Sequence, residues 1–502
     1  MRHKRLFFAL NCCVILISRN VIAFDGQNDL LLISAQHALD EYRQEAENLA
    51  QWCETHSLLP QAELTRGYIL PIEAERIHIP VIPRQKQQDF LSGEASAEIV
   101  FWHNTWMTLR QNLSLKLQEL TKLAIREKRL ILAMQMIHIA LHADPDSEKL
   151  RNVLGFEFYN GQWRTDWEIA QLKRGRVNHT QFGWIPEKHV ARYESGERYF
   201  NGKWISKEQD AREHASINNG WVISTEHYDV QTNHSIEEGV RLSRHLEAFY
   251  YVWKQVFIYY TVSTTELAQR LEGKKLRFKE PRLNFVLFRD RQDYVATLGK
   301  NDPNIAISVG FYDNIAQKCY FFMHDGSFPN SEWDMYRTVF HEGTHQLFHC
   351  VKPVNSISHN NFWATEAVAI YMETLRQEGD YHVLGDQQDV RVLAAKYRFF
   401  RSKFYMPFGN IAKLDMIAFQ RSPYLKELYS QCGGMGFFLM HHDNGVYRDA
   451  FVAFLNEIYM GRTTPRTLFD LLGESPGTLD MQYEKMLEAI PAEFHRDGSK
   501  TN

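Results

Sequence analysis

The sequence has few cysteines, no excess of charge of one sign and, after its first segment, no long hydrophobic stretch. Only four of its six cysteines lie beyond the first 13 residues, too few for a disulfide scaffold, and their spacing fits neither a zinc knuckle nor a redox Cys-x-x-Cys motif. A mean hydropathy of -0.41 excludes a protein with several membrane spans. Ordinary contents of glycine (27), proline (15) and charged residues (24%) exclude collagen-like, coiled-coil and disordered proteins.

Basic residues do not gather into a nucleic-acid footprint. Lysine and arginine number 57 against 61 acidic residues, which gives a formal net charge of -4. The basic clusters at 126–129 and 173–176 are short and interrupted, a pattern typical of solvated surface. We therefore expect no nucleic-acid partner.

The first residues have the pattern of an export signal. Basic residues precede an apolar run over 6–17, and Ala23 offers a small residue at a plausible cleavage point. This pattern predicts a signal peptide over 1–23 and a mature chain that begins near Phe24, exported to the periplasm, the cell surface or the extracellular space. The run is short for a bilayer, which takes about 20 apolar residues. We expect no membrane span after cleavage, with an uncleaved N-terminal anchor as the alternative.

The 502 residues suggest about three globular domains. Helical periodicity dominates residues 24–147, and two small repeated units are predicted over 148–217. Over 218–495 strands and helices are both expected, and beyond about 385 the chain is predicted to be mostly helical. The predicted fold class is therefore α+β. In the third region we expect strands at 221–225 and 283–288.

The repeated units are marked by aromatic residues around an Asn-Gly pair. Tyr-Asn-Gly-Gln-Trp at 159–163 returns as Phe-Asn-Gly-Lys-Trp at 200–204. Asn-Gly favours a tight hairpin turn, across which the aromatic residues can pack. We expect two miniature cores, and an aromatic ligand platform is the alternative.

The most informative segment is His-Glu-Gly-Thr-His at 341–345. On a helix, positions i and i+4 project from one face about 6 Å apart, so His341 and His345 can converge on one ion. Glu342 then lies beside the metal, where its carboxylate can accept a proton from water. The spacing suits tetrahedral zinc.

A catalytic zinc requires a third protein ligand. His349 lies about 12 Å along the helix axis from His341, which is too far to share the ion. Glu366 follows His345 by 21 residues, at the start of a second helical stretch over 361–373 that also carries small residues. Its position between a tryptophan and an alanine-rich run favours a ligand over a solvated residue.

Other residues of these two segments suggest how they pack. Gly343 opposite Ala367 and Ala369 is expected to let the two helices approach closely. Glu373 lies two turns beyond Glu366. It either orients a ligand histidine or meets solvent.

These motifs together, His-Glu-x-x-His at 341–345 and Trp-x-x-Glu-Ala-x-Ala-x-Tyr-x-Glu at 363–373, resemble the gluzincin clan of zinc metallopeptidases, in which Gly often stands in place of Ala367. Residues 221–490 are similar to an exported bacterial family of otherwise uncharacterised gluzincin-like domains. The resemblance implies a small twisted sheet over the zinc helix and a helical lower lobe. The front half of the chain is not covered.

The resemblance also implies a chemistry. His341, His345 and Glu366 would hold one zinc ion, and Glu342 would activate a water on that metal to hydrolyse peptide bonds. A peptide or protein substrate would lie along a hairpin strand at 317–324, expected at the sheet edge.

Gluzincins also use a tyrosine or histidine to stabilise the oxyanion. Tyr429 and Tyr424 are the candidates, and Tyr429 is preferred because Gly433 and Gly434 are expected to open a helix just beyond it.

A different class of function stays open on the sequence alone. In that reading the chain is a non-catalytic interaction or scaffold protein, and its zinc site is structural or vestigial. Three evident ligands argue against a structural zinc, which usually has four. The sequence predicts neither cleavage specificity nor oligomeric state.

Overall fold

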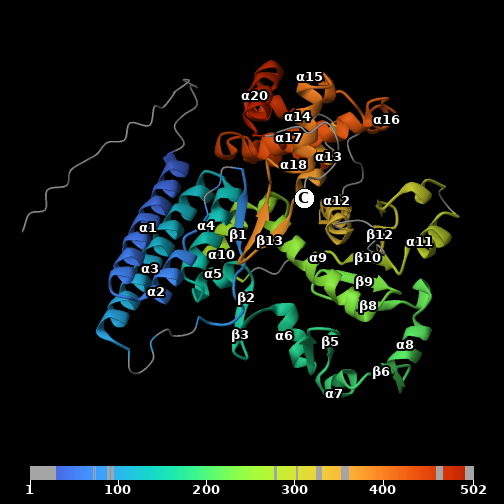
Figure 1. Ribbon diagram of the computed structural model, residues 1–502, viewed down its shortest axis with the longest axis horizontal. Helices are drawn as coiled ribbons and strands as arrows, with labels where there is room; N and C mark the ends of the chain where they lie inside the picture. The colour runs from blue at the N-terminus through green and yellow to red at the C-terminus, as the bar shows by residue number, and fades with distance from the viewer. Residues whose placement is uncertain are drawn as a thin grey trace, which may run out of the picture.

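The computed structural model describes residues 30–71, 73, 75–87, 91, 95–275, 280–300, 303–323, 331–351, 361–459 and 467–491. The predicted signal peptide lies outside the described residues. The fold is mixed α+β, as predicted (Figure 1). N-terminal helices stand on one side in this view, a green and yellow sheet on the other, C-terminal helices above, and small hairpins form an arc below.

The largest sheet has five strands in the order β11-β12-β10-β9-β8. The strands are β8 (Trp221–Ser224), β9 (Tyr228–Thr232), β10 (Leu283–Phe288), β11 (Gly310–Asp313) and β12 (Lys318–Phe322). The three central strands β9, β10 and β12 are parallel, and the outer strands run antiparallel to their neighbours. The predicted strands at 221–225 and 283–288 are confirmed.

One prediction about this sheet is wrong. The strand predicted over 317–324 corresponds to β12, which lies between β10 and β11 and is not an edge. The edge strand is β11, the other half of the same hairpin. The sequence predicts that the two strands pair but carries no signal for which of them continues into the sheet.

Helices cover both faces of this sheet, because successive side chains of a strand point to opposite faces and both sets are apolar here. In β10, Leu283, Phe285 and Leu287 join the core under α9 (Ile236–Val256) and α12 (Ser331–Val351). Val286 and Phe288 face the opposite side, where α11 (Arg291–Leu298) packs. The period of two places α12, which carries the His-Glu-x-x-His motif, directly against the sheet.

The N-terminal region is helical, as predicted, and is joined to the second half of the chain by a strand. Its helices are α1 (Leu30–Thr55), α2 (Leu59–Gly67), α3 (Ala97–Arg126), α4 (Leu130–Ala143) and α5 (Glu148–Val153). Strand β1 (Ile77–Pro80) pairs with β14 (Tyr381–Leu384), which pairs with β13 (Arg376–Glu378). One hydrophobic core includes residues from α1 through α20. Within the described residues, no helix combines the length and apolar character that a membrane crossing requires.

Three small hairpins, each followed by a short helix, lie between residues 156 and 213. Their elements are β2 (Phe156–Tyr159), β3 (Gln162–Thr165), α6 (Asp166–Lys173), β4 (Arg176–His179), β5 (Gly183–Pro186), α7 (Val190–Glu194), β6 (Glu197–Phe200), β7 (Lys203–Ser206) and α8 (Lys207–Glu213). Both predicted hairpins are confirmed, and Asn160 and Asn201 have positive φ in their two-residue turns. The prediction of two units missed the middle one, whose turn at 180–182 lacks the Asn-Gly pair.

The last part of the chain is mostly helical, as predicted. Its helices are α13 (Phe362–Met372), α14 (Val390–Phe400), α15 (Phe408–Ile411), α16 (Met416–Gln420), α17 (Leu425–Gly445), α18 (Arg448–Tyr459), α19 (Leu468–Leu472) and α20 (Pro476–Ala489). The expectation that Gly433 and Gly434 open a helix is wrong, because both lie inside α17. Ala395 of α14 and Tyr483 of α20 fill the space that a side chain at Gly434 would need.

The glycine that lets α13 approach a neighbouring helix is Gly436 of α17, and not Gly343 as predicted. A Cβ atom at Gly343 would meet Phe249 at 3.0 Å and Phe285 at 3.4 Å, so Gly343 faces α9 and the sheet. A Cβ atom at Gly436 would lie 2.6 Å from the backbone oxygen of Ala367. The close approach is therefore between α13 and α17, and it holds the residue next to Glu366.

We expect Gly436→Ala to destabilise the protein by roughly 1–3 kcal/mol, because the added methyl group overlaps a backbone atom that cannot rotate away. Alanine is intrinsically the better helix residue by about 1 kcal/mol, so a tolerated methyl group would stabilise the protein instead. Chemical denaturation measures the sign. Gly67→Ala is the matched control, since a Cβ atom there meets nothing within 4 Å. Equal or greater stability of Gly436→Ala would contradict the close approach.

Candidate metal centre

Helix α12 turns one face to the core and another to α13. Phe340 stacks on Phe249 of α9 with 4.9 Å between ring centroids, and Phe348 packs edge-on against Trp253 at 5.2 Å. These aromatic contacts fix the rotation of α12 about its axis. His341 and His345 consequently project toward α13, with ring centroids 5.0 Å apart.

The structure brings the three predicted ligands together. His341 Nε2 lies 3.4 Å from Glu366 Oε2, and His345 Nε2 lies 3.6 Å from Glu366 Oε1. One potential ligand atom from each residue lies within 4.8 Å of the other two. These three residues form a possible metal-binding triad. His349 is not part of it, because its Nδ1 bonds the Tyr312 hydroxyl at 2.6 Å.

The donor set fits a divalent cation. Glu366 is 4% exposed, and its Oε2 atom accepts no well-aligned hydrogen bond among the described residues, with His341 Nε2 3.4 Å away as its neighbour. A buried acceptor without a donor costs about 1–3 kcal/mol, and more when it is charged. A cation held between Glu366 and the two imidazoles would satisfy that atom.

The protonation of the triad follows from burial and from the surrounding carboxylates. Burial lowers the pKa of His345 to about 4, so this ring is neutral and keeps a lone pair for a metal. Burial would also lower the pKa of His341, but Glu366 and Glu373 raise it well above its ordinary value. The pKa of Glu366 is raised by burial but lowered more by His345 and His341, so it stays ionised.

Glu373 orients His341 and does not meet solvent. Its Oε1 atom lies 2.9 Å from His341 Nδ1, and the residue is 3% exposed. Arg337 donates one hydrogen bond to Glu373 Oε2 at 2.8 Å and another to Asp389 Oδ2 at 2.6 Å. With Nδ1 bonded to Glu373, His341 presents Nε2 toward Glu366. A carboxylate that bonds the outer ring nitrogen commonly orients a metal-bound imidazole in this way.

Glu342 lies beside the triad rather than in it. Its Oε2 atom accepts a hydrogen bond from the backbone N–H of Tyr312 in edge strand β11, at 2.9 Å. Burial raises the pKa of Glu342 to about 7, opposed by His341 and assisted by Glu366. A carboxylate with a near-neutral pKa can both take up and return a proton at physiological pH.

Of the two candidate tyrosines, only Tyr429 lies near the triad. Burial raises the pKa of the Tyr429 phenol, and the carboxylates of Glu366 and Glu342 raise it further, so the hydroxyl stays protonated. Tyr424 is 53% exposed and packs on Phe404. The position suits a donor role for Tyr429, and that role stays a prediction.

Sequence reasoning missed some residues that support the site. Arg337 precedes His341 by one helical turn, so its position on the same face was available from the spacing. Asp389 and the backbone of Tyr312 come from distant segments and carry no local signal.

Comparison with known proteins adds no assignment. No family model matches the chain, and no curated protein matches it.

We expect Glu373→Gln to weaken the binding of a divalent metal ion by roughly 10–100-fold, the usual cost of losing a carboxylate that orients a metal-bound histidine. Competition with a chelating dye measures the affinity, and circular dichroism checks the fold. Glu378→Gln, an exposed carboxylate on nearby β13, is the matched control and should leave the affinity unchanged. Equal affinities of the two variants would show that Glu373 does not orient the ligand.

Proposed function

We propose that this chain is an exported zinc-dependent peptidase of the gluzincin type, which hydrolyses peptide bonds in a peptide or protein substrate. The observation that carries the proposal is the convergence of His341, His345 and Glu366, with Glu342 held beside them by the edge strand. The export pattern of the first residues supports the location. The resemblance of both motifs to gluzincins supports the reaction class.

The donor set favours zinc in a catalytic rather than a structural site. Two imidazole nitrogens and one carboxylate oxygen suit zinc among the common divalent cations. Within the described residues no fourth protein group joins the cluster, whereas structural zinc sites usually have four. When bound, a zinc ion supplies a Lewis acid that polarises a carbonyl group and lowers the pKa of water.

Glu342 is the proposed general base and acid. Its carboxylate takes the proton from the attacking water and later gives it to the leaving amine. The Tyr312 N–H fixes one carboxylate oxygen. The other oxygen is then free to exchange protons with the reacting groups.

The edge of the five-stranded sheet is the proposed binding site for the substrate. Strand β11 is an outer strand, and an extended peptide can pair with such an edge through main-chain hydrogen bonds. The amide of Tyr312 in β11 contacts Glu342, so a peptide alongside β11 passes close to the base. Tyr429, on the α17 side, is the proposed donor to the oxyanion.

We expect Glu342→Gln to reduce peptide hydrolysis by about 10²–10⁴-fold, because the amide cannot accept the proton. The variant should retain one zinc per chain and wild-type secondary structure. Metal analysis together with a peptide-library digest of both proteins measures this. Chelation should abolish cleavage by the wild type, and full activity of Glu342→Gln would reject the mechanism.

We expect Tyr429→Phe to lower kcat by about 10²–10³-fold with little change in KM, the usual cost of losing one oxyanion donor. Steady-state kinetics on any peptide cleaved by the wild type gives both constants. Tyr424→Phe removes the same hydroxyl from an exposed position and should be indistinguishable from the wild type. If both variants turn over at the wild-type rate, Tyr429 has no role in the reaction.

A further inference from the structure

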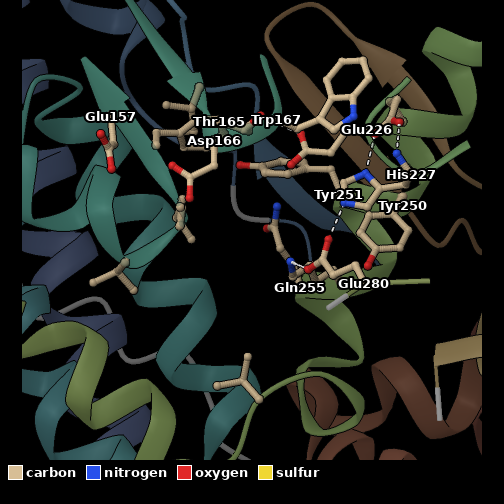
Figure 2. Close-up of a pocket in the computed structure, with 18 of the residues that line it drawn as sticks. Glu157, Thr165, Asp166, Trp167, Glu226, His227, Tyr250, Tyr251, Gln255 and Glu280 are labelled. Carbon is tan, nitrogen blue, oxygen red and sulfur yellow. Dashed lines mark hydrogen bonds and ion pairs between the residues drawn. The ribbon is translucent and has the colours of Figure 1, made fainter. Parts of the chain in front are cut away.

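A cavity of about 1150 Å³ lies away from the metal centre. It is open to solvent on one side and is lined by the first hairpin unit (β2, β3 and α6), by α4, by α9 and by the segment that leads into β10. Figure 2 shows Glu157 and Asp166 on one side, and Tyr251 and Gln255 facing them from α9. No member of the metal-binding triad lines it. Ligand sites commonly measure about 300–1,000 Å³, so the space suffices for a small organic molecule.

One end of the cavity holds a buried group of charges. His227 Nδ1 lies 2.7 Å from Glu247, and Nε2 contacts Glu280, which also pairs with Lys254. Burial would lower the pKa of His227, but the two carboxylates raise it to about 9, so the ring is protonated at neutral pH. His227 and Lys254 together therefore neutralise Glu247 and Glu280.

Glu226 adds a third carboxylate to this end. It accepts a hydrogen bond from Thr165 Oγ1 at 2.8 Å and forms no ion pair with the described residues. Other cations of the lining are engaged elsewhere. Arg84 pairs with Glu168, Lys275 with Glu157 and Arg282 with Asp229, whereas Arg270 donates to the Val153 carbonyl and Lys173 lies over the Tyr159 ring. Burial, together with Glu247 and Glu168, raises the pKa of Glu226, and His227 opposes this rise only in part. The buried carboxylate therefore lacks a full counter-charge and favours a cationic group.

A second part of the lining offers uncharged hydrogen-bonding groups. His138 Nδ1 donates to the Met134 carbonyl at 2.8 Å, so its Nε2 atom is an acceptor, and that atom has no partner among the described residues. Gln255 Nε2, a donor, has none either. Both residues are more than nine-tenths buried. A lone-pair acceptor together with an N–H donor complements an amide group, which carries one of each.

The two polar parts are separated along α9. Glu247, Tyr251 and Gln255 follow at intervals of four residues, so about 12 Å of helix lies between the first and the last. Apolar side chains also line the cavity, among them Val81, Ile82, Val153, Ile258 and Leu267. A ligand that satisfies the whole cavity has a cation at one end, an apolar body and an amide.

We propose that this cavity binds a short apolar peptide through its free N-terminal ammonium group, which pairs with Glu226, while a peptide amide meets His138 and Gln255. The site binds and carries out no chemistry. It is independent of the metal centre and of the peptidase proposal. It would give the protein a second place at which peptides are recognised.

Isothermal titration with leucyl-leucinamide and its N-acetyl derivative tests the charge requirement. The full chain carrying Glu342→Gln serves as background, so that turnover cannot consume the probe. We expect one site per chain for the free amine and at least tenfold weaker binding of the acetylated probe. In Glu226→Gln the two probes should bind equally weakly. Glu213→Gln, an exposed carboxylate outside the cavity, should keep the preference for the amine.

A cavity-filling variant covers the case in which Glu226→Gln fails to fold. Ala170 of α6 lines the cavity, and Ala170→Phe should abolish binding of the amine while the secondary structure remains. Equal binding of both probes to the background protein would overturn the proposal. So would undiminished binding of the amine by Ala170→Phe or by folded Glu226→Gln.

Discussion

The structure depends most on one buried carboxylate, that of Glu366, which faces two imidazoles from the neighbouring helix. Burying this group away from water is expensive unless charge or hydrogen bonds compensate it. His341 and His345 supply part of the compensation, and a cation would supply the rest. The surrounding structure is arranged to hold this contact: aromatic stacking sets the rotation of α12, and Gly436 lets α17 press against α13 next to Glu366.

A series of hydrogen-bonded ion pairs extends from the triad into the surrounding protein. Glu373 fixes His341, Arg337 fixes Glu373, and Asp389 fixes Arg337. All are largely removed from solvent, so each link is stronger than an exposed pair would be. The imidazole is therefore held in one orientation before any ligand arrives, the arrangement that a metal site needs for a defined geometry.

How much of this could be predicted from the sequence depends on distance along the chain. The convergence of His341 and His345 follows from helical spacing alone, and Glu366 follows from a second helix close by. Strand pairing within the 310–322 hairpin was also predictable. The order of strands in the sheet, the partner of Gly343 and the contact between Tyr312 and Glu342 arise from packing between distant segments, for which one sequence gives no signal. The middle hairpin unit was missed because its turn uses residues other than Asn-Gly.

The pairing of β1 with β14 joins residues about 300 positions apart. Strand β13 and the segment that carries Glu373 lie beside β14 in the chain, so the surroundings of the candidate metal centre are connected to an N-terminal strand. Such a non-local contact has a large loop-closure cost and slows folding. The three-stranded sheet cannot be completed until β14 has been synthesised, about 300 residues after β1, so the segment that leads from Glu373 into β13 gains its N-terminal neighbour only after a long stretch of chain has been made.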